Sequence, residues 1–303
     1  MVKAALLTVE EPASLEFAES LATELDVNLY VLTRKIFPDG ESYIRLPSEV
    51  LDENVVVLVY SMVPPQDKSI FEILLSVDAL KSKSIDKVVL VAPYMAYSRQ
   101  DREFLENEGV SIRTLLRTLR LIGVDSLYTI EIHKRESLRY FGEKAYSISP
   151  YRFMAKRLRL PNEILVLAPD LGAVERAKEF AQAINASYDY LVKKRDPITG
   201  DITLEPKRVS VEGEEVVIVD DIISTGGTIA KAARMLLDQG AKSIRVVAAH
   251  ALMVGNALEK IENAGVSRVY AANTLPKIES GLIEYIDVAP IVANALRSTL
   301  LYP

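Results

Sequence analysis

Two adjacent carboxylates, Asp220 and Asp221, directly follow an apolar run in the stretch VVIVDDIISTGGTIAKAARMLLDQG. A loop of small hydroxyl residues and glycines comes next, and its residues are Ser224, Thr225, Gly226, Gly227 and Thr228. Hydroxyls, free N–H groups at a helix start and a closely approaching glycine backbone all suit a phosphate. Carboxylates instead accept hydrogen bonds from the vicinal hydroxyls of a sugar, or bind a metal. Although Thr and Asp also cap ordinary helices, the stretch predicts a site for one ligand that carries both a diol and a phosphate.

Short runs rich in β-branched residues alternate with longer amphipathic segments along the chain. The strand-like runs are 55–60, 87–94, 126–133, 163–170, 215–221, 244–250 and 268–274. The helix-like segments are 67–83, 110–123, 173–184 and 228–240. Continuous apolar runs are typical of buried parallel strands, and apolar residues three and four apart are typical of covering helices. The alternation predicts an α/β fold with the two acids at the carboxyl end of a strand, where such sheets bind ligands.

One unit of strand, loop, helix and strand occurs twice. The run VVVLVYSMVPPQDKS, which begins at residue 55, leads through a helix to SKSIDKVVLVAP, and VVIVDDIISTGGTIA leads through a helix to AKSIRVVAAH. Chance similarity between buried strands is the alternative explanation. We expect a duplicated domain with a boundary near 146–150, which gives domains 1–148 and 149–303. Only the second copy carries the acids and the TGGT loop.

Bulk properties exclude several classes of protein. The 303 residues carry a net charge of −6, so nothing global attracts nucleic acid or an anionic membrane, and we expect neither partner. Cysteine is absent, which excludes disulfides and thiolate chemistry. The beginning of the chain has too short an apolar run for a signal peptide, and no run approaches the roughly 20 apolar residues of a membrane span. We therefore expect a cytoplasmic protein.

Four further segments narrow the interpretation. They are 37-FPDGE, 93-PYMAYSRQDR, 131-EIHKRESLRYF and 168-APDLGAVERA. The acidic pair with its TGGT loop resembles the ribose-phosphate motif of the type I phosphoribosyltransferase fold. With the four segments in this order, nearly the whole chain resembles the ribose-phosphate diphosphokinase (PRPP synthetase) family, in an archaeal form. The resemblance implies two tandem domains of that fold, each a mainly parallel sheet flanked by helices.

The resemblance also implies which residues bind ATP. The turn residues are Phe37, Asp39, Gly40 and Glu41, which in the family reach across a subunit contact with the phenyl ring against adenine. Arg99 and Gln100 match the family's other ATP residues, and an arginine there suits phosphate. Without the resemblance, Pro-Asp-Gly is only a turn, and the SRQDR segment is only a solvated loop.

Two residues match the family's Mg²⁺ positions, namely His133 and Asp170. A lone histidine or a helix-capping aspartate is the structural alternative for each. The chain departs from the family pattern at two neighbouring positions. Glu131 replaces the usual aspartate before the histidine, which puts a direct role of this acid in doubt, and Ala173 replaces the second glycine of the diphosphate loop.

A polar, basic segment at 189–208 is predicted to form a hairpin or lid, with the lid loop at 193–206. The family carries a lysine and an arginine here, one residue apart. Aligning V-K-K-R on that pattern gives Lys193 and Arg195 as the catalytic pair, with Arg195 also near the ribose 5-phosphate, and Lys194 is the fallback. A solvated basic loop is the structural alternative.

The resemblance therefore predicts a Mg²⁺-dependent transferase of nucleotide biosynthesis that acts on ATP and ribose 5-phosphate. It implies a homo-oligomer with the ATP site at a subunit interface. The chain has neither G-x-x-x-x-G-K-[ST] nor G-x-G-x-x-G, which disfavours a P-loop kinase or a dinucleotide enzyme. The alternatives are a nucleobase phosphoribosyltransferase, which would consume PRPP, and a regulatory homologue without catalysis.

Overall fold

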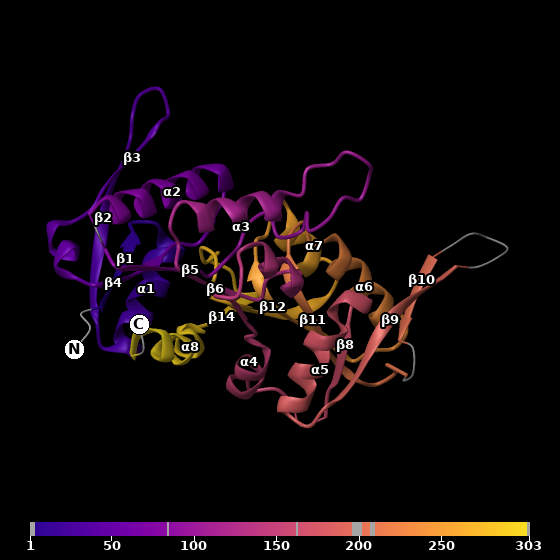
Figure 1. Ribbon diagram of the computed structural model, residues 1–303. Helices are drawn as coiled ribbons and strands as arrows, with labels where there is room; N and C mark the ends of the chain where they lie inside the picture. The colour runs from indigo at the N-terminus through magenta and orange to yellow at the C-terminus, as the bar shows by residue number, and fades with distance from the viewer. Residues whose placement is uncertain (1–3, 84, 162, 196–201, 207–209, 302–303) are drawn as a thin grey trace. The chain divides into compact units, whose positions relative to one another are not determined.

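The computed structural model describes residues 4–83, 85–161, 163–195, 202–206 and 210–301 (Figure 1). The side chains of residues 193–195, 202–206 and 298–301 lie outside that description. The chain divides into two compact units. The first contains residues up to Ser149, together with Thr274–Pro276 and the segment that begins at Asp287. The second contains Pro150–Asn273 and Lys277–Ile286.

A sheet of seven strands forms the centre of the first unit, counted over the described residues, in the order β3-β2-β1-β4-β5-β6-β7. The strands are β1 (Ala4–Val9), β2 (Asn28–Ile36), β3 (Ser42–Arg45), β4 (Val55–Val59), β5 (Lys87–Ala92), β6 (Ser126–Ile130) and β7 (Ala145–Ile148). All neighbours pair parallel except β2 and β3. Every residue of β4 is buried, which explains its uninterrupted β-branched sequence.

The second unit repeats this arrangement, with the order β10-β9-β8-β11-β12-β13-β14 in its described part. Its strands are β8 (Leu165–Ala168), β9 (Ser187–Arg195), β10 (Ile202–Pro206), β11 (Glu215–Ile223), β12 (Ser243–Ala251), β13 (Val266–Ala272) and β14 (Ile283–Ile286). Only β9 and β10 pair antiparallel. The two sheets therefore have the same strand order: β8 takes the place of β1, β9 that of β2, and so on to β14, which takes the place of β7. The expected α/β fold with two copies of one mainly parallel sheet is therefore confirmed.

Helices lie between most of the consecutive parallel strands, and α8 follows the last strand. In the first unit they are α1 (Pro12–Leu25), η1 (Ser48–Asp52), α2 (Gln66–Ser82), α3 (Ser111–Leu121), η2 (Arg135–Tyr140) and α8 (Ala289–Leu301). In the second unit they are α4 (Tyr151–Arg157), η3 (Leu171–Ala173), α5 (Val174–Ala183), α6 (Gly227–Asp238) and α7 (Ala257–Glu262). Among the described residues, no helix combines the length and the apolar character that crossing a membrane demands.

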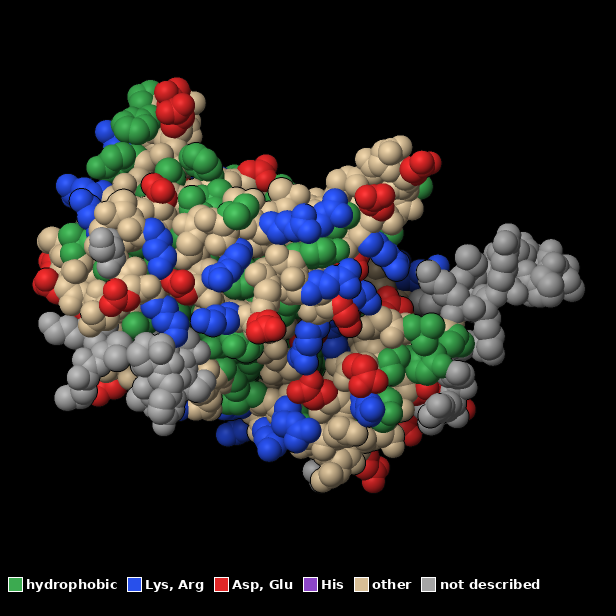
Figure 2. Space-filling view, in the orientation of Figure 1, with side chains coloured by type: hydrophobic (Ala, Val, Ile, Leu, Met, Phe, Trp, Pro, Cys, Tyr) green, Lys and Arg blue, Asp and Glu red, His purple; other side chains and the backbone are tan. Residues whose placement is uncertain are grey.

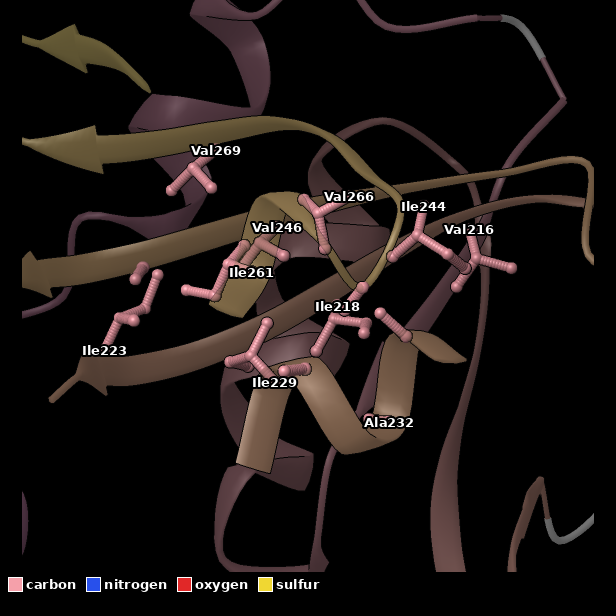
Figure 3. Close-up of a cluster of buried hydrophobic side chains, with 14 of the residues drawn as sticks. Val216, Ile218, Ile223, Ile229, Ala232, Ile244, Val246, Ile261, Val266 and Val269 are labelled. Carbon is pink, nitrogen blue, oxygen red and sulfur yellow. The ribbon is translucent and has the colours of Figure 1, made fainter. Parts of the chain in front are cut away.

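The core of the second unit holds the strand that carries the acidic pair. Figure 3 shows Val216 and Ile218 of β11 among Val246 of β12, Ile229 of α6 and Ile261 of α7. All five side chains are at most 2% exposed. Side chains packed this tightly occupy few alternative positions, so the carboxyl end of β11 and the start of α6 are held on a rigid base.

The first compact unit extends to Ser149, whereas the sequence predicts a boundary after residue 148. The segment that begins at Asp287 groups with the first unit, although the sequence-based division assigns it to the second domain. Within the first unit, Arg297 of α8 donates from Nη2 to the Glu24 carbonyl at 2.9 Å, and Ser20 of α1 donates to Asp287 at 2.5 Å. Helix α8 thus packs on α1.

Candidate active site

The acidic pair lies at the carboxyl end of β11, as the sequence predicts. Asp221 is 5% exposed, and Asp220 is half-buried. The Asp221 N–H donates to Asp220 Oδ1 at 2.9 Å, and the Ile222 N–H donates to Asp221 Oδ1 at 2.9 Å. The buried Tyr151 hydroxyl of α4 donates to the Asp220 carbonyl at 2.9 Å. The backbone that carries both acids is therefore held by their own side chains and by Tyr151.

The two acids differ in their electrostatic surroundings. Burial, followed by the negative charge of Asp221, raises the pKa of Asp220 to about 8, and Asp170 contributes in the same direction. Asp221 instead has a cationic neighbour, because Arg176 Nη2 of α5 lies 3.5 Å from its Oδ2. Carboxylates gathered in this way attract a cation or the hydroxyl donors of a sugar. The arrangement also shows that Asp170, at the end of β8, lies close enough to influence the pair.

The loop after β11 leads directly into α6. Gly226 is the N-cap residue, and no side chain caps the helix there. Met253 N–H donates to the Ile223 carbonyl at 3.0 Å and Val254 N–H donates to the Ser224 carbonyl at 2.9 Å, so the segment that follows β12 holds the start of the loop in place. Thr225, Gly227 and Thr228 are exposed, and Ser224 is half-buried. An uncapped helix start with exposed hydroxyls beside it is suited to an anion.

Gly226 is required by both its backbone and its surroundings. Its φ is +72°, and an added Cβ would lie 2.9 Å from the Ala257 carbonyl oxygen and 3.2 Å from the Ile261 side chain. We expect Gly226→Ala to lower the free energy of unfolding by about 1–3 kcal/mol. If the loop binds ribose 5-phosphate, as the resemblance implies, we also expect this variant to raise the KM for that substrate at least about tenfold, because the N–H groups of the loop must shift. Thermal unfolding and steady-state kinetics measure the two effects.

The neighbouring glycine supplies a matched control for stability. A Cβ on Gly227 would meet only the Thr225 hydroxyl, at 3.9 Å, and its φ is not positive. Gly227→Ala should therefore change the free energy of unfolding by less than about 0.5 kcal/mol. An equal loss of stability in the two variants would contradict the packing argument at Gly226.

Asp170 occupies the turn that follows β8. Its Oδ1 accepts from the Gly172 N–H at 2.8 Å and from the Ala173 N–H at 3.2 Å, so it caps the short helix η3. The capping alternative considered for this residue is therefore present in the structure. Arg176 Nη1 donates to the Gly172 carbonyl at 3.0 Å while Nη2 approaches Asp221, so one guanidinium links this turn to the acidic pair.

The side chains around the acidic pair suit Mg²⁺ better than a metal ion that is held by protein ligands alone. Within the described ranges, no three histidine, cysteine, aspartate or glutamate side chains are grouped to hold a metal ion. Mg²⁺ usually keeps several waters and takes one or two carboxylates together with substrate phosphates. An exposed Asp170 carboxylate near two further acids and a phosphate-type loop satisfies that requirement.

The FPDGE segment forms the tip of the β2–β3 hairpin, which projects from its unit in Figure 1. Phe37 N–H donates to the Glu41 carbonyl at 2.8 Å, and Gly40 N–H donates to the Phe37 carbonyl at 2.9 Å, with Gly40 at a φ of +95°. The Glu41 N–H donates to Asp39 Oδ1 at 3.1 Å. All four predicted residues are exposed, so the tip presents an aromatic ring and two acids to the surroundings.

Arg99 and Gln100 lie on the loop after β5, where Arg99 is exposed. Sequence reasoning missed the residue that organises this loop, Glu108. Its Oε2 accepts from the Phe104 N–H at 2.8 Å, from the Leu105 N–H at 3.0 Å and from Gln100 Nε2 at 3.3 Å. The N–H groups of Leu105 and Phe104 lower the pKa of Glu108, with a smaller contribution from the Gln100 amide. No periodic pattern in the sequence connects Gln100 with Glu108.

His133 is half-buried and follows β6 by three residues. Glu131 takes a φ of +36° at the end of this strand, and its N–H donates to the Ile148 carbonyl of β7 at 3.0 Å. The Ile132 N–H donates to Ser147 Oγ at 3.0 Å. The backbone before His133 is therefore tied to the neighbouring strand. The histidine lies at the carboxyl end of the first sheet, as the sequence predicts.

The predicted lid coincides with strands β9 and β10, which pair antiparallel from Arg195↔Ile202 to Leu191↔Pro206. Lys193 and Arg195 belong to β9, and their side chains lie outside the described part of the structure. Residues 196–201 and 207–209 of the lid segment also lie outside it. In sheet order, this pair of strands occupies the position that β2 and β3 occupy in the first unit.

Each half of the chain matches a known protein family. Residues 6–123 match the family of the N-terminal domain of ribose phosphate pyrophosphokinase, and residues 151–275 match the phosphoribosyl transferase domain family. The chain is 41% identical over 280 residues to the ribose-phosphate pyrophosphokinase of Sulfurisphaera tokodaii, which covers 92% of this chain and 96% of the relative. It is also 42% identical over 287 residues to the ribose-phosphate pyrophosphokinase of Aeropyrum pernix. That alignment covers 94% of this chain and 93% of the relative. Both relatives are archaeal, as the resemblance indicates.

A solved structure agrees with these matches. The crystal structure of phosphoribosylpyrophosphate synthetase from Mycobacterium smegmatis aligns with a TM-score of 0.87 at 25% identity, over 99% of this chain and 100% of that one. A nucleobase phosphoribosyltransferase would not account for the match of the first half to a pyrophosphokinase domain. The chain therefore belongs to the ribose-phosphate pyrophosphokinase family.

Proposed function

We propose that the site in the second unit binds ribose 5-phosphate with its ring hydroxyls toward the acidic pair and its phosphate in the loop. Asp220 and Asp221 accept hydrogen bonds from the vicinal hydroxyls. The 5-phosphate takes N–H groups and hydroxyls from the loop residues Ser224, Thr225, Gly226, Gly227 and Thr228. The observation that carries the proposal is the juxtaposition of two adjacent acids with an uncapped helix start, on one rigid strand and loop.

The first unit supplies the ATP site in this proposal. Phe37 stacks on the adenine, and Asp39, Gly40 and Glu41 complete the contacts of the hairpin tip. Arg99 and Gln100 hold the phosphates from the loop after β5. In this proposal the protein acts as a homo-oligomer with ATP at a subunit interface, and the exposed tip is suited to reaching a nucleotide on a neighbouring subunit. The sequence-based expectation of a cytoplasmic location remains a prediction.

The protein is a ribose-phosphate pyrophosphokinase, which makes PRPP. The 1-hydroxyl oxygen of ribose 5-phosphate forms a bond to the β-phosphorus of ATP, and the bond from that phosphorus to the bridging oxygen of AMP breaks. AMP leaves with the oxygen, and the hydroxyl proton is lost. Positioning and charge neutralisation dominate such transfers.

The protein side chains act on charge and geometry. Lys193 and Arg195 neutralise the charge that develops on the transferred diphosphoryl group. His133 in the first unit and Asp170 in the second are two separate positions that would each hold Mg²⁺, and the metal would supply further charge neutralisation on the phosphates when bound. Arg176 keeps Asp221 oriented through its contact at 3.5 Å.

A coupled assay of the purified protein tests the reaction and the two alternatives. With ATP, ribose 5-phosphate and Mg²⁺, AMP and PRPP should appear in equal amounts, and omission of the sugar phosphate should abolish AMP release. Diphosphate release that requires PRPP and a nucleobase would instead identify a phosphoribosyltransferase. ATP binding without AMP release would identify a regulatory homologue.

A further inference from the structure

The β2–β3 hairpin extends beyond the sheet that carries it. Strand β2 pairs with β1 only up to Val9↔Leu32. From Thr33↔Arg45 to Ile36↔Ser42, the two strands of the hairpin pair only with each other in the strand register. An isolated two-stranded hairpin is marginally stable in water. Something outside the strand ladder must therefore hold this arm if its tip is to keep one position.

A buried carboxylate of α2 makes contacts with both strands of the arm. Glu72 is 1% exposed. Its Oε1 accepts from Ser42 Oγ of β3 at 2.8 Å and lies 3.6 Å from Arg34 Nε of β2. Its Oε2 accepts from the hydroxyl of Tyr60, a fully buried residue directly after β4. One side chain thus joins the helix, the centre of the sheet and both strands of the arm, and we call these four residues the Glu72 cluster.

The charges in the Glu72 cluster agree with a stable connection. A buried carboxylate is costly unless it is paired and hydrogen-bonded, and here it has a cation and two hydroxyl donors. Burial, followed by the hydrogen bond and negative charge of Glu72, raises the pKa of Tyr60 above its usual range, so the phenol remains a donor. Loss of any donor would leave part of a buried charge unsatisfied.

Apolar packing contributes little to holding the arm in this chain. The apolar side chains around it are exposed by 42% at Val31, 46% at Ile36, 39% at Tyr43 and 55% at Phe71. Figure 2 shows hydrophobic side chains at the surface along this hairpin and acidic ones near its end. Because these side chains stay largely in contact with solvent in the single chain, the polar contacts of the Glu72 cluster restrain the arm beyond residue 33 together with the half-buried Ile44.

We propose that Glu72 is a positioning residue that fixes the direction of the arm and thereby the affinity for the nucleotide. This inference rests on the proposed binding of ATP by the hairpin tip. Glu72 touches no substrate and acts through Ser42 and Arg34 on the strands that carry Phe37 and Asp39. Its removal should therefore weaken ATP binding while the ribose 5-phosphate site remains unchanged.

Hydrogen exchange and kinetics of Glu72→Ala test both halves of the inference. Amide exchange at residues 33–36 and 42–45 should become at least about tenfold faster, because the arm opens more often. The KM for ATP should rise at least about tenfold, and the KM for ribose 5-phosphate should change less than about twofold. Glu72→Gln keeps a hydrogen-bond acceptor for Ser42, so it should recover a large part of both effects.

Two further variants keep the test decisive. If Glu72→Ala does not fold, Ser42→Ala removes one contact of the arm and leaves Arg34 and Tyr60 on the carboxylate, and the same split between the two KM values is expected. Glu11→Gln is the matched control, because Glu11 is also a buried carboxylate, 7% exposed, and it caps α1 rather than the arm. It should lower stability without changing the KM for ATP selectively.

Phe37→Ala separates failure of the inference from failure of the proposed function. If Phe37→Ala raises the KM for ATP and the Glu72 variants do not, the inference is wrong and the proposed role of the tip survives. If neither change affects ATP, the assignment of the tip to the nucleotide is wrong, and the inference falls with it. Unchanged amide exchange in the arm of Glu72→Ala would also overturn the inference.

Discussion

Replacing Lys193 by alanine should lower kcat at least about 10³-fold, with the affinity for ATP little changed, because a well-placed cation contributes roughly 10³–10⁵ to such transfers. On the proposed assignment, the lysine meets charge that develops only as the diphosphoryl group moves. On the same assignment, ground-state binding of ATP depends on the other unit, through the hairpin tip and Arg99. Steady-state kinetics of AMP release, together with equilibrium binding of ATP, measure the two quantities separately.

Lys194→Ala is the matched control for Lys193, since the two residues are neighbours on β9. It should lose less than about tenfold in kcat. A loss below tenfold in Lys193→Ala would remove this lysine from the mechanism. If Lys194→Ala carried the large loss instead, the fallback alignment of the lid would be the correct one.

Asp220→Asn should stabilise the ligand-free, metal-free protein at alkaline pH and impair catalysis. The folded pKa of Asp220 is raised to about 8, whereas an unfolded aspartate titrates near about 3.9. Between these values the folded state holds the proton and the unfolded state does not, so the wild type loses stability as the pH rises from about 4 to about 8. The amide removes that loss, and its oxygen can still accept from the Asp221 N–H.

The expected gain in the free energy of unfolding follows from the shift of the Asp220 pKa. We reduce it because Asp220 is only half-buried. Above about pH 8 the variant should exceed the wild type by about 2 kcal/mol in the free energy of unfolding, with no difference near pH 4. On the proposed assignment, the KM for ribose 5-phosphate should rise at least about 30-fold, since the amide offers the sugar hydroxyls one acceptor oxygen where the carboxyl group offers two. Denaturant unfolding at several pH values and kinetics measure these changes.

The same substitution at the neighbouring acid supplies the control. Asp221 pairs with Arg176, so Asp221→Asn removes a buried partner of that cation and should lower stability. A stability gain at Asp220 that did not depend on pH would contradict the electrostatic explanation. So would an equal gain in both variants.

The sequence predicts the interior of the fold well because buried parallel strands have a distinctive composition. The apolar runs at 55–60 and 215–221 correspond to β4 and β11, and the segments at 67–83 and 228–240 correspond to α2 and α6. The buried strand β1 was not predicted, and neither were β2, the edge strands β3, β7 and β14, or the helices α1, α4, α7 and α8. The edge strands are four residues long and only partly buried, so they lack a continuous apolar run.

The residues of the candidate site were likewise predicted only in part. Residues next to one another in sequence, such as the acidic pair and its loop, were predicted because they form a motif. Contacts between distant residues were not, since no spacing rule connects Arg176 with Asp221 or Ser42 with Glu72, which are 45 and 30 residues apart. Such pairs depend on how α5 and α2 pack on their sheets, and packing is set by the whole core rather than by local sequence.

The matching strand orders of the two sheets have an evolutionary consequence. The arm with the FPDGE tip and the strands with Lys193 and Arg195 occupy equivalent places in two sheets of the same strand order. On the proposed assignment, one copy has specialised in recruiting the donor and the other in driving the transfer. Selection could then tune the choice of nucleotide in one half of the gene while the reacting machinery in the other half was left intact.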